Sequence, residues 1–503
     1  MSTAAPTVQR FSDSVDASVW RKIFSFPVML MGLLSALAVL TVRARFDDPD
    51  MWWHLKTGQI VWTTHRVPTV DVFAYTTGHH PWVPHEWLAQ TLIYLAYRLG
   101  GYSGLMLWFC IFSAALLIAA YALCTLYSGN AKVAFLGAMT VWLFATTGLA
   151  IRPQMIGYLL LIVELLLLQL GRVRSPRWFF GLPPLFAVWV NCHGSFFLGL
   201  VVAATFLFGS FCDFRLGSLV ALPWESGRRK MLAWTLVLSA AALLLNPAGI
   251  QQVLYPLNAM FGQPVGLVSV QEWMPLQMAS ARGIALMAVL GCVFLVVVAR
   301  RSELFWQELM LLALGTWLAV SHERMLFVFG ILAAPVISRV LSTFWDGYDP
   351  ARDLPWANAI LIGTSLLAMV WGFPSPNNLT RQVERNSPVQ AVDYLTTHRL
   401  SGNMLNDYVY GGYLIWAAPD HPVFVDGRAD VFEWTGILTE VGKWAMLQTN
   451  PNDLLDRHNI SFCLLARTSP MANVLPLLPD WKAVYSDKMA VIFVRTAAPA
   501  PSR

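Results

Sequence analysis

Three aspartates lie close together at the start of one polar loop, and their positions are Asp47, Asp48 and Asp50. The loop, residues 43–101, begins where a strongly apolar segment, residues 26–42, ends. Carboxylates at the end of a membrane span are costly unless they face water, a metal ion or a substrate. Such a carboxylate can accept a proton from an incoming hydroxyl group as a general base; a solvated loop or a helix cap is the alternative. We take Asp48 and Asp50 as candidate catalytic residues.

The same loop carries further side chains that can bind or transfer protons. His54 follows Asp50 by four residues, so the two would lie on one face of a helix. His54 can orient the carboxylate, help to bind a cation, or simply lie at the membrane interface. Asp48, Asp50 and His54 are also the candidate ligands for a divalent metal ion, Mg²⁺ or Mn²⁺. His85 is a candidate substrate-binding residue and Glu86 a candidate catalytic one, unless Glu86 only stabilises a helix N-terminus.

Two arginines outside the basic loops of the chain, Arg152 and Arg324, suit the recognition of a phosphate. A planar guanidinium group binds phosphate oxygens bidentately, and a lipid-linked phosphate would arrive at this depth. Pairing with Glu323 or another carboxylate is the alternative. A histidine beside a span can likewise be a packed polar residue that a neighbour satisfies. The remaining candidate substrate-binding residues, all in polar loops, are His193, Glu272 and His322.

The composition indicates a membrane protein. The chain has 503 residues, of which 56% are hydrophobic and 13% charged, whereas a soluble domain has about 25% charged residues. Its net charge of +5 requires no nucleic-acid partner, because lysines and arginines gather in short loops between apolar segments. The six cysteines are scattered without a CxxC pair, so we expect neither a disulfide framework nor a zinc site.

Eleven segments are apolar enough to be membrane spans of about 20 residues each. They lie at residues 26–42, 103–127, 133–150, 155–170, 178–190, 195–212, 231–246, 283–299, 304–320, 325–342 and 356–373. With the N-terminus in the cytoplasm, the basic clusters at 172–177, 228–230 and 300–301 fall on one face, as the positive-inside rule requires. The candidate residues fall on the opposite, extracytoplasmic face of a bacterial plasma membrane.

The polar loop contains two predicted helices. Residues 51–61 predict an amphipathic helix along the membrane interface, anchored by tryptophans. A turn that includes Pro68 ends it. A second helix is predicted from about Pro84 to Gly100 and Gly101, because glycines are typical of a helix end.

From about Pro374 the composition is that of a soluble domain. Helical pieces alternate with β-like runs at residues 423–426, 460–466, 481–485 and 489–495, which predicts a small α/β domain. The first run ends in VDGRAD, residues 425–430, where a ligand site and an internal Asp–Arg pair are equally good interpretations. The predicted organisation is a cytoplasmic N-terminus at 1–25, a membrane module at 26–373, an extracytoplasmic α/β domain at 374–496 and a disordered tail at 497–503.

The polar loop resembles that of the GT-C superclass. It contains, in order, an aspartate after the first span, an amphipathic helix, a proline turn and an acidic residue that opens the next helix. The members of this superclass are integral-membrane glycosyltransferases that use polyprenyl-phosphate-linked sugars. DPDMWWHLKTGQIVWTTHRVPTVD (48–71) and HEWLAQTLIYLAYRLGG (85–101) are similar to the first loop of the protein mannosyltransferases and the lipid A aminoarabinose transferase. The match implies that Asp48 or Asp50 corresponds to the catalytic aspartate of the family, and that Glu86 corresponds to the later glutamate of its first loop. The family has a second acidic residue directly after this aspartate; if Asp50 is aligned with the aspartate, Met51 occupies the position of the second acidic residue.

The resemblance implies a polytopic, α-helical glycosyltransferase of the bacterial inner membrane. It would move a sugar, with inversion, from a polyprenyl-phosphate donor to a glycan, lipid or protein acceptor on the outer face of the bilayer. Asp48 or Asp50 would deprotonate the acceptor, and Arg152, Arg324 or both would hold the leaving phosphate. The competing hypotheses are a transporter or flippase for lipid-linked glycans and a non-catalytic assembly protein for an envelope polysaccharide.

Overall fold

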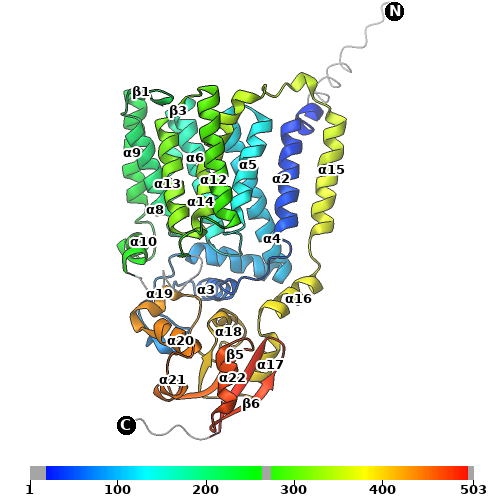
Figure 1. Cartoon of the computed structure of the whole chain (residues 1–503), viewed down its shortest axis with the longest axis vertical. Coiled ribbons are helices and arrows are strands. Elements are labelled where there is room, and N and C mark those ends of the chain that lie inside the picture. The colour runs from blue at the N-terminus through cyan, green and yellow to red at the C-terminus, as the bar shows by residue number, and fades with distance from the viewer. Residues whose placement is uncertain (1–18, 263–272, 497–503) are drawn as a thin grey trace, which may run out of the picture.

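Two layers make up the molecule in Figure 1, a computed structural model that describes residues 19–262 and 273–496. The larger layer is a bundle of helices, and the smaller one is a C-terminal layer of short helices and one sheet. The first polar loop lies between them. The candidate residues of this loop therefore lie where the two layers meet.

The bundle contains a helix on every predicted apolar segment. Its helices are α2 (Phe26–Val42), the second part of α4 (Trp87–Ser128), α5 (Ala131–Ala145), α6 (Gln154–Val173), α7 (Leu182–Trp189), α8 (Phe196–Gly209), α9 (Ser226–Ala242), α12 (Ala281–Arg300), α13 (Trp306–Ser321), α14 (Leu326–Leu341) and α15 (Pro355–Gly372). Within the described residues, five helices are long and apolar enough to cross a membrane. The predicted multi-pass, α-helical class is confirmed.

The two helices predicted in the first loop are present. Helix α3 (Met51–Thr64) buries Trp52, Leu55 and Thr57 against the rest of the protein. It packs closely on α4 because Gly58 has no side chain: a Cβ there would lie 2.1 Å from the carbonyl oxygen of Gln90. The second predicted helix ends at its two glycines, as expected. Element α4 is two helices joined by a kink, where Gly100 and Gly101 have non-helical backbone angles and the φ angle of Gly101 is +56°.

The C-terminal layer is built on a four-stranded sheet in the order β4-β5-β7-β6. Strand β4 is parallel to β5, and the other neighbours are antiparallel. The strands are β4 (Asn403–Asn406), β5 (Ile460–Ala466), β6 (Trp481–Ser486) and β7 (Ala490–Arg495). The helices of this layer are α16 (Pro376–Asn386), α17 (Val389–Thr397), α18 (Gly411–Ala417), α19 (Ala429–Phe432), α20 (Ile437–Ala445), α21 (Pro451–Arg457) and α22 (Pro470–Val474).

One predicted strand is wrong and one was missed. Residues 423–426 form no strand, because their amides bond to a loop and to a side chain instead of to the backbone of a neighbouring strand. The amide of Val423 donates to the carbonyl of Phe73 at 3.0 Å, and that of Phe424 to the Asn406 side chain at 2.7 Å. A single bridge to Ala74 remains. Strand β4, which sequence patterning did not indicate, joins the edge of the sheet.

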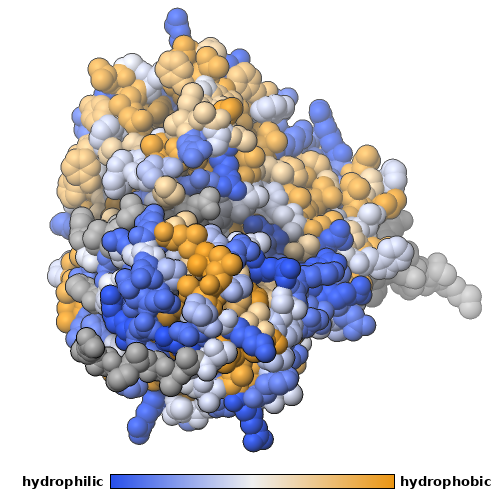
Figure 2. All heavy atoms as spheres, turned by 60° about the horizontal axis from the view of Figure 1, so that its bottom comes forward, coloured by the Kyte–Doolittle hydropathy of each residue, from blue (hydrophilic) through white to orange (hydrophobic). Residues whose placement is uncertain are grey.

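The opposite end of the molecule carries a small sheet that was not predicted. It contains β1 (Phe214–Leu216), β2 (Leu219–Ala221) and β3 (Leu304–Phe305), next to the start of α9 and the end of α12. Helix α10 (Ile250–Gly262) lies on the side of the first loop instead. Figure 2 shows the C-terminal end of the molecule, where hydrophilic residues prevail around one hydrophobic patch and the hydrophobic bundle surface lies beyond.

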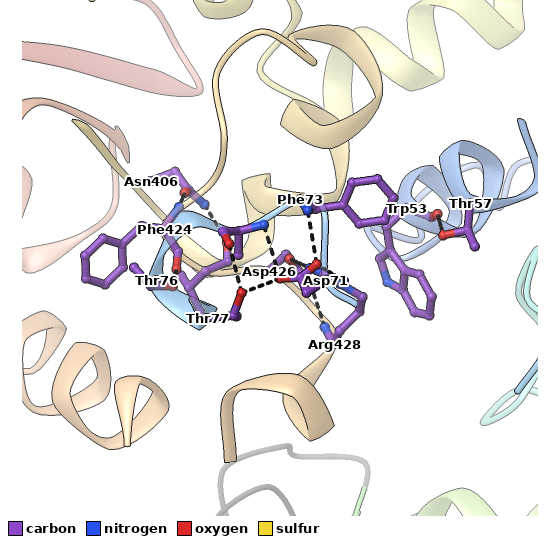
Figure 3. A network of polar contacts seen from close by, with 12 residues as sticks. Trp53, Thr57, Asp71, Phe73, Thr76, Thr77, Asn406, Phe424, Asp426 and Arg428 are labelled. Carbon is purple, nitrogen blue, oxygen red and sulfur yellow. Dashed lines mark hydrogen bonds and ion pairs between the residues drawn. The ribbon is translucent and has the colours of Figure 1, made fainter. Parts of the chain in front are cut away.

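A buried ionic network joins the first loop to the C-terminal layer (Figure 3). Arg428 is 2% exposed; its Nη1 donates to Asp71 at 2.6 Å, and its Nε and Nη2 donate to Asp426 at 2.8 and 2.7 Å. Asp71 and Asp426 are fully buried. The guanidinium group also lies over the rings of Phe73 and Trp82. VDGRAD therefore contains the internal Asp–Arg pair, extended by an aspartate 357 residues away.

Removing the Arg428 side chain would leave two carboxylates buried without their cation. We expect Arg428→Ala to lower the free energy of unfolding by about 3–5 kcal/mol, the usual effect of breaking a buried ion pair. Chemical denaturation in detergent micelles, followed by tryptophan fluorescence, measures this. The matched control is Arg457→Ala, since Arg457 is 64% exposed in its pair with Glu440; it should cost no more than about 1 kcal/mol. Equal losses in both variants would contradict the structural role of Arg428.

Candidate functional site

Asp48 and Arg152 form the centre of the site. Asp48 lies between α2 and α3, and Arg152 lies in the turn between α5 and α6. The Arg152 Nη2 donates to Asp48 Oδ1 at 2.7 Å and its Nε donates to Asp48 Oδ2, so the pair is bidentate. The Asp48 side chain is only 5% exposed, and its Oδ1 also accepts the backbone amide of Asp50 at 3.0 Å. The candidate arginine is thus paired with a candidate aspartate, as the alternative interpretation held.

Asp50 lies on the other side of the same guanidinium group. Its Oδ2 is 3.2 Å from Arg152 Nη1, and its side chain is 19% exposed. Asp50 is the residue just before α3, but the described structure contains no capping bond from its side chain to that helix. One arginine therefore holds two carboxylates, of which Asp50 is the more exposed.

A pocket of about 400 Å³ opens beside this ion pair. The turn between α5 and α6 forms one wall, and the junction between α13 and α14 contributes to the other. Its charged lining residues are Arg45, Asp47, Asp48, Arg152, Arg282, Glu323 and Arg324. Four guanidinium groups around a polar hollow suit an oxyanion with several oxygens, such as a phosphate.

The arginines of the pocket are held by neighbours that orient them. Arg324 Nη2 donates to Gln154 Oε1 at 2.5 Å, and its guanidinium group lies 4.6 Å from the ring centroid of Trp273. Arg282 forms an ion pair with Glu323. Arg45 Nη2 donates to the carbonyl of Thr146 at 3.3 Å.

Glu86 lies in a second polar cluster, surrounded by three histidines. One of its oxygens is 3.5 Å from His193 Nε2 and 3.7 Å from His85 Nε2, and the other is 3.7 Å from His54 Nδ1. The Glu86 side chain is 11% exposed. The structure thus brings together four predicted site residues that come from three separate parts of the chain.

The hydrogen bonds of His193 determine which of its ring nitrogens carries the proton. The backbone amide of Ser195 donates to His193 Nδ1 at 3.1 Å, so Nδ1 is an acceptor. Trp189 Nε1 donates to the Ser195 hydroxyl at 3.0 Å, and that hydroxyl lies 2.8 Å from the same Nδ1. The proton of a neutral His193 is therefore on Nε2, which faces Glu86.

The cluster extends to the C-terminal layer through two residues that were not among the predicted site residues. The ring of His85 stacks on that of Tyr255 with centroids 3.7 Å apart. The Tyr255 hydroxyl donates to Asp430 Oδ2 at 3.2 Å. Tyr255 belongs to α10 and Asp430 to α19, so two elements from later in the chain extend the cluster around Glu86.

Burial shifts the protonation of this cluster. It raises the pKa of Glu86 to about 8; the carboxylates of Asp430 and Asp50 add to the rise, and Arg324 and Arg152 oppose it. Burial lowers the pKa of His85 to about 3 and holds that of His54 well below its usual value. At neutral pH the carboxyl group therefore carries the proton and these histidines are neutral.

These shifts predict how stability depends on pH. The raised pKa of Glu86 stabilises the fold fully below 4.5, its ordinary value, and this contribution is lost as the pH rises through about 8. The lowered histidine pKa values act in the opposite range, since their contribution is complete above 6.5 and is lost on acidification. Between pH 6.5 and 8, the titration of Glu86 therefore lowers the stability of the fold.

We expect the melting temperature of the purified chain to fall between pH 6.5 and 8, and the Glu86→Gln variant to lose most of this slope because glutamine does not titrate. Thermal unfolding in detergent across this range tests the expectation. Glu225→Gln is the matched control, because the Glu225 side chain is 79% exposed; it should keep the wild-type slope. A Glu86→Gln variant with an unchanged slope would contradict a proton on Glu86 at neutral pH.

The residues proposed as metal ligands do not form a metal site. Asp48 and Asp50 are both paired with Arg152, and His54 Nδ1 lies 3.1 Å from the amide nitrogen of Gln90. Across the described residues, no group of three or more histidine, cysteine, aspartate or glutamate side chains is arranged to hold a metal ion.

Two predicted residues lie apart from these clusters or outside the described structure. His322 lies at the end of α13, and its Nδ1 is 2.7 Å from the carbonyl oxygen of Trp273. It therefore contacts the residue on whose ring the Arg324 guanidinium group lies. Glu272 lies outside the described residues.

Sequence reasoning also missed three charged residues. Arg45 and Arg282 line the pocket, and the signal that selected Arg152 and Arg324, an arginine on the predicted extracytoplasmic side, applies equally to them. The signal for Asp71 was weaker: it is a charged residue among Val70, Val72 and Phe73.

No protein-family model matches the sequence, and no curated protein matches it. Solved structures do match the fold. The Archaeoglobus fulgidus oligosaccharyltransferase, crystallised with a tethered acceptor peptide, has a TM-score of 0.53 and 12% identity, over 88% of this chain and 70% of that one.

Two further structures are similar. The arabinofuranosyltransferase AftD from Mycobacteria has a TM-score of 0.53 and 14% identity, over 92% of this chain and 41% of that one. ArnT from Cupriavidus metallidurans, in its apo state, has a TM-score of 0.50 and 12% identity, over 97% of this chain and 100% of that one. All three are GT-C glycosyltransferases, so the GT-C resemblance of the first loop is confirmed as a likeness of fold.

Proposed function

Starting from a GT-C fold with an arginine-lined pocket beside two acidic residues, we propose that this chain is a membrane glycosyltransferase. It takes a sugar from a polyprenyl-phosphate-linked donor and passes it to a glycan, lipid or protein acceptor on the outer face of a bacterial inner membrane. The observation that carries the proposal is the pocket of about 400 Å³, lined by four arginines and by Asp48.

The arginines suit the phosphate of the donor. Arg324, Arg282 and Arg45 bind its oxygens, and Arg152 links this anion site to the acidic residues. As the sugar leaves, the bridging oxygen gains negative charge, which fixed cations stabilise without reorganisation. An oligosaccharyltransferase of the same fold has been solved with a dolichol-phosphate, which supports a lipid phosphate as the donor group.

Asp50 is the proposed base. Asp48 accepts two bonds from Arg152 and one from a backbone amide, so its role is to fix the guanidinium group. Asp50 has the more exposed carboxylate, 19% against 5%. It removes the proton of the acceptor hydroxyl, whose oxygen attacks the anomeric carbon. The bond from that carbon to the phosphate oxygen breaks, the electron pair leaves with the lipid phosphate, and the configuration inverts.

Glu86 stays protonated in the second cluster. With its pKa near 8 it remains neutral while Asp50 works, so the site does not hold a third carboxylate charge. His85, His193 and His54 contact the substrate beside it. We place the membrane module at 26–373 with eleven spans, and the α/β domain at 374–496 outside the cytoplasm, so that both clusters face the compartment in which the donor sugar lies.

The test is sugar transfer in membranes from cells that express the chain, supplied with radiolabelled polyprenyl-phosphate sugars. The wild type should move label into an acceptor fraction and release unlabelled lipid phosphate, whereas membranes without the chain should not. Translocation of intact labelled donor across proteoliposomes, with no consumption, would instead support the transporter. No transfer from any donor would contradict the proposed function.

A further inference from the structure

The turn that carries both acidic residues packs against two glycines of the C-terminal layer. At Gly412 in α18, a Cβ atom would lie 2.3 Å from the carbonyl oxygen of Pro49. At Gly427 in VDGRAD, a Cβ atom would lie 1.9 Å from Asp50 Oδ1. Both distances are far below 3.0 Å, the closest approach of real Cβ contacts. The Asp50 carboxylate therefore occupies the space that a side chain at position 427 would fill.

Gly427 itself cannot easily move away from Asp50. The residues on either side of it, Asp426 and Arg428, are the buried ion pair that also binds Asp71 (Figure 3). The Asp50 carboxylate thus has a rigid backbone on one side and Arg152 Nη1, at 3.2 Å, on the other. Its position is fixed from both layers of the molecule.

We propose that Gly427 is a positioning residue for the Asp50 carboxylate, so that the C-terminal layer completes the catalytic site of the membrane module. This inference rests on the proposed function, in which Asp50 is the base. It assigns a role to the VDGRAD segment beyond its buried ion pair: Asp426 and Arg428 fix the backbone, and the glycine between them leaves room for the carboxylate.

Alanine at position 427 separates positioning from folding. The atom it would meet is the end of a flexible side chain, so the Asp50 carboxylate moves while the backbone stays. The displacement needed is more than 1 Å, because 1.9 Å must become at least 3.0 Å. Misplacing a catalytic group by about 1 Å can cost on the order of 10²-fold in rate. None of the residues that line the arginine pocket is changed.

The experiment compares purified wild type, Gly427→Ala and Gly442→Ala in the transfer assay. Gly442 in α20 is the matched control, since a Cβ there would have no atom within 4 Å. We expect Gly427→Ala to lower kcat on the order of 100-fold, with an unchanged KM for the lipid donor and a displaced acid limb of the rate–pH profile. Gly442→Ala should behave as the wild type. Wild-type kcat in a folded Gly427→Ala variant would overturn the inference and leave the proposed function standing.

A stability cycle tests the same contact without any transfer assay. Asp50→Ala removes the carboxylate and makes room for the new methyl group. Gly427→Ala should therefore lower the melting temperature of the wild type but not that of Asp50→Ala, and a variant that fails to fold alone should fold in the double mutant. Additive effects would show that the two residues do not meet and would overturn the inference. If the cycle is non-additive but the wild type transfers no sugar, the proposed function fails by itself.

Discussion

Asp50→Asn is expected to lower the rate of sugar transfer by about 10²–10⁴-fold, the usual contribution of a general base. Asparagine keeps the size of the side chain beside Gly427 but cannot accept the acceptor proton. The donor pocket does not include residue 50 among its lining residues, so the affinity for the lipid phosphate should stay near that of the wild type. Initial rates at saturating donor, together with donor titration, separate these two effects.

The matched variant is Asp48→Asn, which removes the partner of Arg152 rather than the base. It should lower the melting temperature, because Arg152 loses its bidentate carboxylate, and it should weaken donor binding as the guanidinium group turns away. Asp50→Asn should show neither change. If instead Asp48→Asn abolished transfer with intact stability while Asp50→Asn remained active, the assignment of the base would be reversed.

Arg324→Ala is the second substitution with a large expected effect. A hydrogen bond to a charged group contributes about 1.5–3 kcal/mol, so losing the guanidinium group should weaken donor binding by roughly 10- to 150-fold. The Asp48–Arg152 pair is untouched, and kcat at saturating donor should fall less than kcat/KM. Arg324→Lys keeps the charge but not the planar fork, and its affinity should lie between those of the wild type and the alanine variant.

The control for this prediction is Arg352→Ala. It removes the same charge at a side chain that is 89% exposed, beside the start of α15 at the opposite end of the bundle. Its donor affinity should equal that of the wild type. A titration with polyprenyl phosphate, read by thermal shift, measures the donor affinities of the three purified variants, Arg324→Ala, Arg324→Lys and Arg352→Ala. Equal affinities for Arg324→Ala and Arg352→Ala would exclude Arg324 from the phosphate site.

Local patterns predicted the helices well and the β-structure less well. Apolar segments coincide with helices because burying backbone polar groups in a bilayer requires helical bonding. Strands β5, β6 and β7 match the predicted runs, whose β-branched and aromatic residues suit a sheet. Residues 423–426 have the same composition, but their amides bond to Phe73 and Asn406, partners that no local pattern can reveal.

The sequence indicated individual candidate residues, whereas their contacts could not be predicted. The predicted extracytoplasmic side pointed to Glu86, Arg152 and Arg324, and the structure places Arg152 and Arg324 in one pocket. The pairing of Arg428 with Asp71 spans 357 residues, and the contact of Gly427 with Asp50 spans a similar distance in the chain. Such contacts depend on how the two layers meet, which composition and periodicity do not encode.

A single-turnover experiment with the purified chain in lipid nanodiscs tests most directly whether Asp50 is the base of sugar transfer. A labelled polyprenyl-phosphate sugar is supplied at a level close to that of the protein, with a mixture of acceptor glycans and lipids. If Asp50 is the base, the wild type releases one lipid phosphate for each sugar transferred, and Asp50→Asn binds the donor but releases almost none. Equal release by wild type and Asp50→Asn, or bound donor that the wild type leaves intact with every acceptor, would contradict this role of Asp50.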